Sequence, residues 1–296
     1  MSNSPFISNC TAEAIRDAAL ALKAGHLVAF PTETVYGLGA DARNPEAVKR
    51  IYEVKGRPTD HPLIVHISSL NQLDKWAIDI PEYAIKLARK FWPGPMTLIL
   101  KRSEIARDFI TGGQSTVGLR VPSDPIAQAL IVEFERISNS AIAAPSANRF
   151  GRLSPTTADH VLEQLDGRID AVLLGEATEI GVESSVVALD ADGPARLLRH
   201  GGIPLEDLAR VLADHGGIVA VVPTAQPGVP LQAPGMTESH YAPIVPLLLV
   251  TGEFPAGVTE CALLAPDRAT LTQLEGLAAA SGATVHASVA LSEALD

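Results

Sequence analysis

The sequence predicts an α/β domain, in which helices pack against a mostly buried sheet, followed by a smaller α/β unit. Short apolar runs, such as residues 27–30 and 185–189, alternate with amphipathic helical runs over the first 215 residues. A stretch with six prolines, residues 223–246, interrupts this alternation. The hydrophobic content of 47% is ample for a core in a chain of 296 residues.

The first elements have clear start and stop signals. Residues 11–25 form an amphipathic helix, with Thr11 as its cap and Gly25 as its stop. Residues 27–30 form a buried strand that ends before a proline, which cannot donate to a sheet ladder. Asn44 followed by Pro45 starts the next helix, and Gly56 ends it. The segment from 30 to 67 therefore brings Thr32, Thr34, Tyr36, Lys55, Arg57 and His66 within reach of one pocket.

Later elements follow the same alternation. Helices are predicted at 69–78, 82–91, 125–134, 157–165 and 204–215, and strands after the turn at 93–95 and at 115–121, 141–144, 172–174, 185–189 and 195–198. The predicted domains are a catalytic domain at 1–215, a proline-rich linker at 216–244 and a short α/β domain at 245–296. The last of these should contain strands at 245–250 and 261–264 and a helix at 270–280.

Composition argues against several classes of protein. No run approaches the roughly 20 apolar residues of a membrane helix, and the N-terminus lacks a signal pattern, so a cytoplasmic location without membrane association is expected. Cys10 and Cys261 lie far apart without metal-type spacing. The net charge is −11, and residues 203–296 hold ten acidic side chains against two basic ones. Direct tRNA binding should therefore be weak or absent.

Lys55 and Arg57 flank the glycine that ends the helix at 45–55. Two cations projecting from a loop suit a phosphate site, and an arginine fork can bind two phosphate oxygens. The alternative is a solvated helix end whose cations complement the dipole. No Walker A, HExxH or GxSxG motif is present in the sequence. Any ATP site must therefore be of another kind.

Four further residues have open interpretations. His66 lies in the apolar run PLIVHI and is either a core histidine or a ligand contact. Arg120, in GLRVP, either binds the carboxylate of a ligand or forms a salt bridge with a remote Asp or Glu. Ser146 and Asn148, in APSANRFG, either reach a phosphate or ribose or cap a turn.

Six ordered motifs, FPTETVYGLGADA, KGRP with PLIVHI, WPGPMTLIL, STVGLRVP, APSAN and ESSVV, resemble the YrdC-like threonylcarbamoyl-AMP synthases. APGM and HYAP are similar to the linker of the longer, two-domain members. The resemblance covers roughly residues 10–205. It implies a twisted mixed sheet around a central cavity, plus a small C-terminal α/β domain. It also implies synthesis of threonylcarbamoyl-AMP and pyrophosphate from L-threonine, bicarbonate or CO2, and ATP, for modification of tRNA.

The resemblance also implies roles for individual residues. Lys55 and Arg57 would stabilise charge on the phosphoryl groups, and Mg2+ would accompany ATP with few protein ligands. Tyr241 and the linker would act as a lid over the nucleotide. The implied L-threonine contacts are Thr34, His66, Arg120, Ala144 and Ser184. The implied ATP contacts are Arg57, His61, Thr116, Ser146, Ser154, Arg199 and Tyr241. His61 departs from the family pattern, which usually has Asn there, so its contact could become pH-dependent.

Two other functions are weighed against this one. A carbamoyl-transfer enzyme of related fold would carry zinc-finger segments with CxxC pairs, and this sequence has none. A non-catalytic RNA-binding module would show a basic face, which the charge argues against. Other tRNA-modification proteins would receive the product of the synthase.

Overall fold

The computed structural model describes residues 6–189, 193–221, 248, 250 and 252–291. The chain divides into two compact units, residues 1–242 and 243–296, which are described separately. Among the described residues, no helix has the length and apolar character needed to cross a bilayer.

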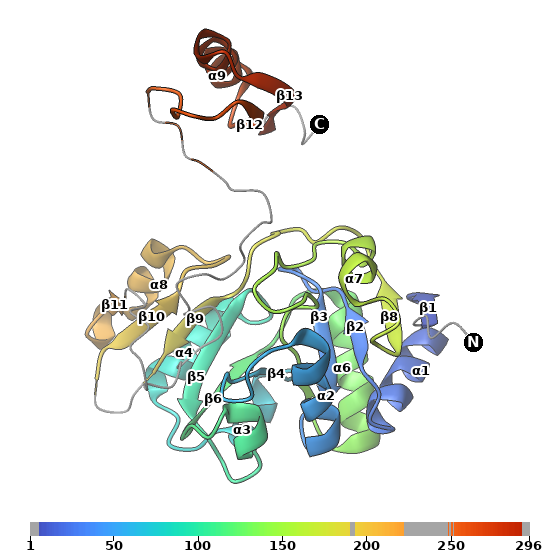
Figure 1. Cartoon of the computed structure of the whole chain (residues 1–296). Helices are drawn as coiled ribbons and strands as arrows, with labels where there is room; N and C mark the ends of the chain where they lie inside the picture. Colours follow the sequence, from blue (N-terminus) through green and yellow to red (C-terminus); the bar gives the residue numbers. More distant parts are fainter. Residues whose placement is uncertain (1–5, 190–192, 222–247, 249, 251, 292–296) are drawn as a thin grey trace. The chain divides into compact units, whose positions relative to one another are not determined.

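The first unit is built on an eleven-stranded mixed sheet (Figure 1). The strand order is β1-β8-β2-β3-β7-β4-β6-β5-β9-β10-β11. Its strands are β1 (Phe6–Asn9), β2 (Val28–Phe30), β3 (Gly37–Asp41), β4 (Ile64–His66), β5 (Met96–Lys101), β6 (Thr116–Arg120), β7 (Ile142–Ala143), β8 (Ala171–Leu174), β9 (Ser185–Ala188), β10 (Ala195–Arg199) and β11 (Ile218–Ala220). The α/β prediction with a mixed sheet is therefore confirmed.

Helices pack on both faces of this sheet. They are α1 (Ala12–Lys23), α2 (Pro45–Lys55), α3 (Leu73–Trp76), α4 (Glu82–Phe91), α5 (Asp108–Thr111), α6 (Pro125–Ser138), α7 (Ala158–Leu165) and α8 (Leu205–Leu212), with 3-10 turns at Leu70–Gln72 and Ala213–His215. Local signals explain several ends. The Asn44 side chain accepts hydrogen bonds from the first turn of α2, and Gly56 ends that helix in the left-handed conformation. Asp124 caps α6 in the same way, ahead of a proline.

Two cores that include described helices lie against the sheet, one on each face. α1 and α6 pack together with Val28, Phe30 and Leu173 on one face, while α2, α3, α4, α7 and α8 contribute to the core on the other. A third apolar cluster, Ile99, Val186, Ala188 and Leu198, contains no helical residue among those described. It shares a face of the sheet with Gly118, since a Cβ on that glycine would lie 3.1 Å from Ile99. The apolar residues on this part of the sheet therefore pack against one another and not against a described helix.

The second unit is a single β-α-β arrangement. β12 (Glu260–Ala265) and β13 (Thr284–Ala290) pair in parallel, and α9 (Arg268–Ser281) connects them. Leu263, Leu271 and Ala278 form its small core. The predicted strand at 261–264 and helix at 270–280 fall within these elements. Most of the predicted strand at 245–250 lies outside the described residues, and residues 248 and 250 are not in a strand.

The sequence prediction needs four corrections in the first unit, two of them short elements that it missed, β1 and α5. Residues 218–220, predicted as part of the linker at 216–244, form β11 and pair in parallel with β10. The segment Gly37–Asp41, not predicted as a strand, is β3 and pairs with β2 and β7. Most of the predicted linker, residues 222–244, lies outside the described residues.

Candidate active site

A cavity opens where β4 and β6 meet the loops that follow β2 and β7. Pairing of His66 with Arg120 across β4 and β6 places both side chains on one face of the sheet. The lining residues are Thr32, Thr34, Val35, Gly37, Arg57, Ile64, His66, Arg120, Ala144, Pro145, Ser146, Glu183 and Arg199. Seven of them were predicted to contact L-threonine or ATP. The sequence therefore brings distant motifs together at one site.

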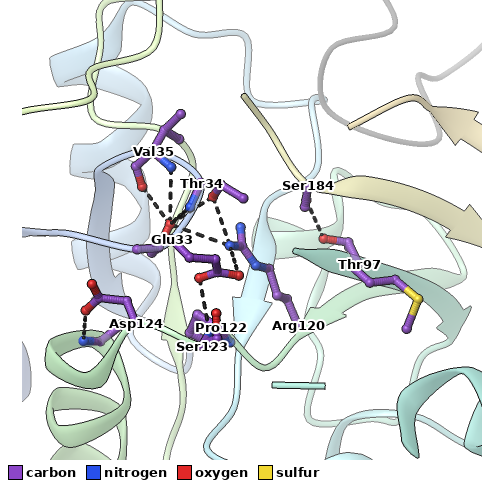
Figure 2. Close-up of polar contacts among 12 residues, drawn as sticks. Glu33, Thr34, Val35, Thr97, Arg120, Pro122, Ser123, Asp124 and Ser184 are labelled. Carbon is purple, nitrogen blue, oxygen red and sulfur yellow. Dashed lines mark hydrogen bonds and ion pairs between the residues drawn. The ribbon is translucent and has the colours of Figure 1, made fainter. Parts of the chain in front are cut away.

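Arg120 is held in the wall of this cavity by an acid. Its Nη2 donates to Oε1 of Glu33 at 2.8 Å and to Oγ1 of Thr34 at 2.9 Å. Both members of the ion pair are 4% exposed. Figure 2 shows the Glu33 and Arg120 side chains pointing toward one another. The salt bridge to a remote acid, one of the two readings of Arg120, is therefore present, and it leaves other guanidinium nitrogens for a ligand.

A tight turn after β2 orients the two threonines. Thr32 Oγ1 donates to the carbonyl of Val35 at 2.7 Å and accepts from the backbone N–H of Thr34 at 3.2 Å. Such a side-chain turn fixes the backbone locally. Thr34 Oγ1 lies 2.8 Å from Thr32 Oγ1, so the two hydroxyls share a hydrogen bond beside Arg120.

His66 is neutral in the folded protein. Its side chain is 4% exposed, and burial, together with the nearby Arg120 cation, lowers the pKa of His66 to about 3. The ring packs edge-on against Phe30, with centroids 6.2 Å apart. A neutral imidazole can donate or accept a hydrogen bond in the cavity without adding charge.

A second acid, Glu183, lines the same cavity and is 16% exposed. Glu183 accepts a hydrogen bond from Ser154 Oγ at 2.7 Å, and its other oxygen lies 3.6 Å from Nη2 of Arg199. Burial alone would raise the pKa of Glu183, but Arg199, Ser154, Arg120 and Lys55 together hold it below its ordinary value. This carboxylate is therefore ionised and faces a strongly cationic surrounding.

Ser184, next in the chain, is fully buried and is not a lining residue of the cavity. Its Oγ lies 2.8 Å from Oγ1 of Thr97, and both its Oγ and its carbonyl accept hydrogen bonds from Arg199 (Figure 2 draws the contact with Thr97). Ser184 thus connects the β5 wall of the site to Arg199.

Lys55 differs from the expectation of a cation projecting from a loop. Its side chain is buried, and Nζ donates to the carbonyls of Ser146 and Asn148, both at 2.5 Å, and to Oδ1 of Asn148 at 3.3 Å. The three donors of the ammonium group are therefore occupied by the loop after β7. Burial and Arg57 lower the pKa of Lys55 well below its ordinary value. Lys55 is not a lining residue of the cavity.

Arg57 does line the cavity, whereas His61 and Thr116, two other predicted ATP contacts, are not among its lining residues. Arg57 Nη2 donates to the carbonyl of Pro62 at 3.0 Å. The ring of His61 packs on Phe150, with centroids 5.5 Å apart, and burial and Arg57 lower the pKa of His61. Thr116 is on the same face of β6 as Arg120, four residues away, or about 13 Å along the strand. It is outside the cavity itself.

The structure also corrects other predictions from sequence. Tyr36 was expected near the pocket, but its hydroxyl binds the backbone of Gly175. Asn148 was a candidate for phosphate or ribose, but its amide donates to the carbonyls of Arg149 and Arg152 within its own loop. Tyr241, the proposed lid residue, lies outside the described residues.

Sequence reasoning missed two functional candidates, Glu33 and Glu183. Glu33 stands between two predicted pocket threonines, and Glu183 directly precedes Ser184. Their positions inside two of the motifs were the available signal. The partner of each acid is more than ten residues away in the chain, so the charge pairing itself could not be seen in sequence.

Comparison with known proteins identifies two family models that match this chain. A Sua5/YciO/YrdC family model, described as "Telomere recombination", matches residues 20–201. A second model, described as "Threonylcarbamoyl-AMP synthase, C-terminal domain", matches residues 203–287. The two matches together cover most of the chain.

Curated relatives carry the same description. The threonylcarbamoyl-AMP synthase of Pyrococcus abyssi is 49% identical over 242 residues, which cover 80% of this chain and 68% of that protein. The Bacillus subtilis synthase is 47% identical over 239 residues, covering 80% of this chain and 67% of that protein. The chain thus spans about two thirds of the length of these relatives.

A solved structure matches the fold. The crystal structure of P. abyssi Sua5 complexed with L-threonine superposes with a TM-score of 0.77 at 42% identity, covering 93% of this chain and 76% of that one. With the motifs, the sheet and the family matches in agreement, the chain belongs to the Sua5/YrdC family of threonylcarbamoyl-AMP synthases.

Proposed function

We propose that this protein makes threonylcarbamoyl-AMP and pyrophosphate from L-threonine, bicarbonate or CO2, and ATP. The observation that carries the proposal is the charge of the cavity. Arg57, Arg120 and Arg199 line it, and Glu183 is the acid among its described lining residues. With His66 neutral, the wall carries a net positive charge, as required for a polyphosphate and a carboxylate together.

The amino acid would occupy the end of the cavity formed by Thr34, His66, Arg120 and Ala144, with the predicted contact Ser184 buried behind the lining. Arg120 would pair with the carboxylate, and the hydroxyl of Thr34 and the ring of His66 would offer hydrogen bonds. The triphosphate would lie toward Arg57, Ser146 and Arg199, with His61, Thr116 and Ser154 nearby. Tyr241 remains a proposed lid residue.

In the reaction, the amino nitrogen of L-threonine takes up a carboxyl group, so that threonine ammonium and bicarbonate become a carbamate, water and a proton. A carbamate oxygen then attacks the α-phosphorus of ATP. The bond from that phosphorus to the bridging oxygen breaks, and pyrophosphate leaves. The protein holds the labile carbamate in line with phosphorus and stabilises charge on the phosphoryl oxygens.

Mg2+ would accompany ATP as part of the substrate. Among the described residues, no group of three His, Cys, Asp or Glu side chains is placed to hold a metal ion. Glu183 and the phosphate oxygens are the hard oxygen ligands available at the cavity, which fits an ion held mainly by the nucleotide.

The product gives the direct test. Purified protein is incubated with ATP, L-threonine and isotopically labelled bicarbonate, and the mixture is analysed at once by mass spectrometry. The proposal predicts a labelled adenylate of L-threonine carbamate that is absent without L-threonine. Labelled AMP conjugates formed equally without the amino acid would contradict it and favour another carbamoyl acceptor.

A further inference from the structure

We propose that Glu33 is a positioning residue that fixes Arg120 for recognition of the carboxylate of the amino-acid substrate. The inference rests on the proposed function. Glu33 is not one of the cavity-lining residues, whereas Arg120, Thr32 and Thr34 are. Glu33 therefore acts from behind the wall, through the guanidinium that faces the ligand.

One nitrogen of the Arg120 guanidinium makes all of its hydrogen bonds to described residues. Its hydrogen bonds to described residues, with Glu33, Thr34 and a longer one to Thr32, all come from Nη2. Its Nε is buried and has no hydrogen-bond partner among the described residues. An arginine carries five N–H donors, and those on Nε and Nη1 have no hydrogen-bond partner among the described residues. A buried donor without a partner is costly, which is expected where a ligand supplies the acceptor.

Glu33 needs both of its oxygens for this task. Oε1 accepts from Arg120, and Oε2 accepts from the backbone N–H of Ser123 at 3.1 Å (Figure 2). Its backbone carbonyl accepts from the N–H of Ile180 at 2.8 Å. The carboxylate thus connects Arg120 to the loop at Ser123, while the backbone of Glu33 is held by the loop at Ile180. A glutamine at position 33 has one acceptor oxygen and cannot serve both donors.

Electrostatics alone predicts that replacing Glu33 would strengthen binding of the substrate carboxylate, which is the opposite of what a positioning role predicts. Removing the charge of Glu33 would leave Arg120 without its internal counter-ion and would by itself strengthen attraction for a carboxylate. A positioning role predicts weaker binding instead, because the guanidinium loses its fixed orientation. The direction of the change in KM therefore separates the two explanations.

The test compares E33Q, E33D and a matched control, E135Q. Glu135 is also a partly buried carboxylate that accepts from a backbone N–H and a hydroxyl, those of Ser68, but it is outside the cavity. Pyrophosphate release is measured against L-threonine concentration at saturating ATP and bicarbonate. We expect E33Q to raise KM for L-threonine about tenfold or more and KM for ATP less than about twofold. E33D, which keeps the charge, should recover part of the loss, and E135Q should match the wild type.

An L-threonine analogue without a carboxylate and an R120K background test whether the effect of E33Q on KM depends on Arg120. L-Threoninamide lacks the carboxylate, so the preference for L-threonine over this amide should fall in E33Q. In an R120K background, E33Q should raise KM no further. A folded E33Q enzyme with unchanged or lower KM for L-threonine would overturn the inference, as would an equal loss with the amide. Wild-type protein that ignores L-threonine altogether would contradict the proposed function instead.

Discussion

Replacement of Lys55 by Met tests whether this lysine holds the loop after β7 or acts on phosphate. Its ammonium group donates to the carbonyls of Ser146 and Asn148 and to the Asn148 side chain. The substitution keeps the length of the side chain and removes every donor. Each buried acceptor left without a donor costs about 1–3 kcal/mol. Relief from burying the charge offsets part of this, so we expect a net loss of about 2–4 kcal/mol in the free energy of unfolding.

Lys75 offers a matched control. Its Nζ donates to the carbonyl and Oδ1 of Asn139, both at 2.7 Å, but at an exposed position. K75M should therefore cost less than about 1 kcal/mol. Urea unfolding measures the free energy of unfolding of both variants. At about 3 °C per kcal/mol, the melting temperature of K55M should lie about 6–12 °C below that of the wild type.

Kinetics complete this test. Because Ser146 lines the cavity, a loosened loop should raise KM for ATP more than it lowers kcat. If K55M instead keeps full stability and KM for ATP but loses nearly all turnover, the clamp explanation is wrong. Lys55 would then act on the phosphates directly, as the sequence motif suggests.

Two further predictions concern pH and backbone geometry. His66 is neutral when folded, with a pKa of about 3, and takes up a proton near pH 6.5 when unfolded, so its contribution to stability falls as pH drops below about 6.5. This site alone should remove about 2 kcal/mol by pH 5, and H66N should show a correspondingly flatter stability profile in urea unfolding from pH 7 to 5; an unchanged slope would refute a neutral buried histidine. Gly112 has φ of 62° and a Cβ there would lie 2.2 Å from the carbonyl of Asp60, whereas Gly113 has φ of 79° and open space. G112A should therefore cost about 2–4 kcal/mol and G113A about 1 kcal/mol, and equal thermal shifts for the two variants would contradict the close approach.

Sequence reasoning succeeded where the signals are local. The helix α2 begins after Asn44 and ends before Gly56, because a side-chain cap, a proline and a left-handed glycine act within a few residues of the ends. The strand β3 was missed because its glycines favour no strand by themselves. Gly39 is there because a Cβ would lie 2.9 Å from Ile142 and from Phe30, which come from other strands.

In the candidate site too, local signals could be read from the sequence, whereas contacts between distant segments could not. The motifs identified His66 and Arg120 as candidates and the family resemblance implied Arg199, and each of the three lines the cavity. The direction of the Lys55 side chain could not be read from its position beside a helix-ending glycine, because its acceptors lie more than 90 residues later. Glu33 was missed for the same reason, since its partner Arg120 lies at the end of β6, which only the strand order β2-β3-β7-β4-β6 brings near the loop after β2.

The central claim is tested most directly by pyrophosphate release from ATP, with and without L-threonine and with and without bicarbonate. The proposed synthase reaction predicts release that requires both, since no carbamate forms when either is missing. Residual CO2 must be removed from the buffers for the second arm. Release of pyrophosphate at the same rate without L-threonine would contradict the account and assign this cavity to a different acceptor.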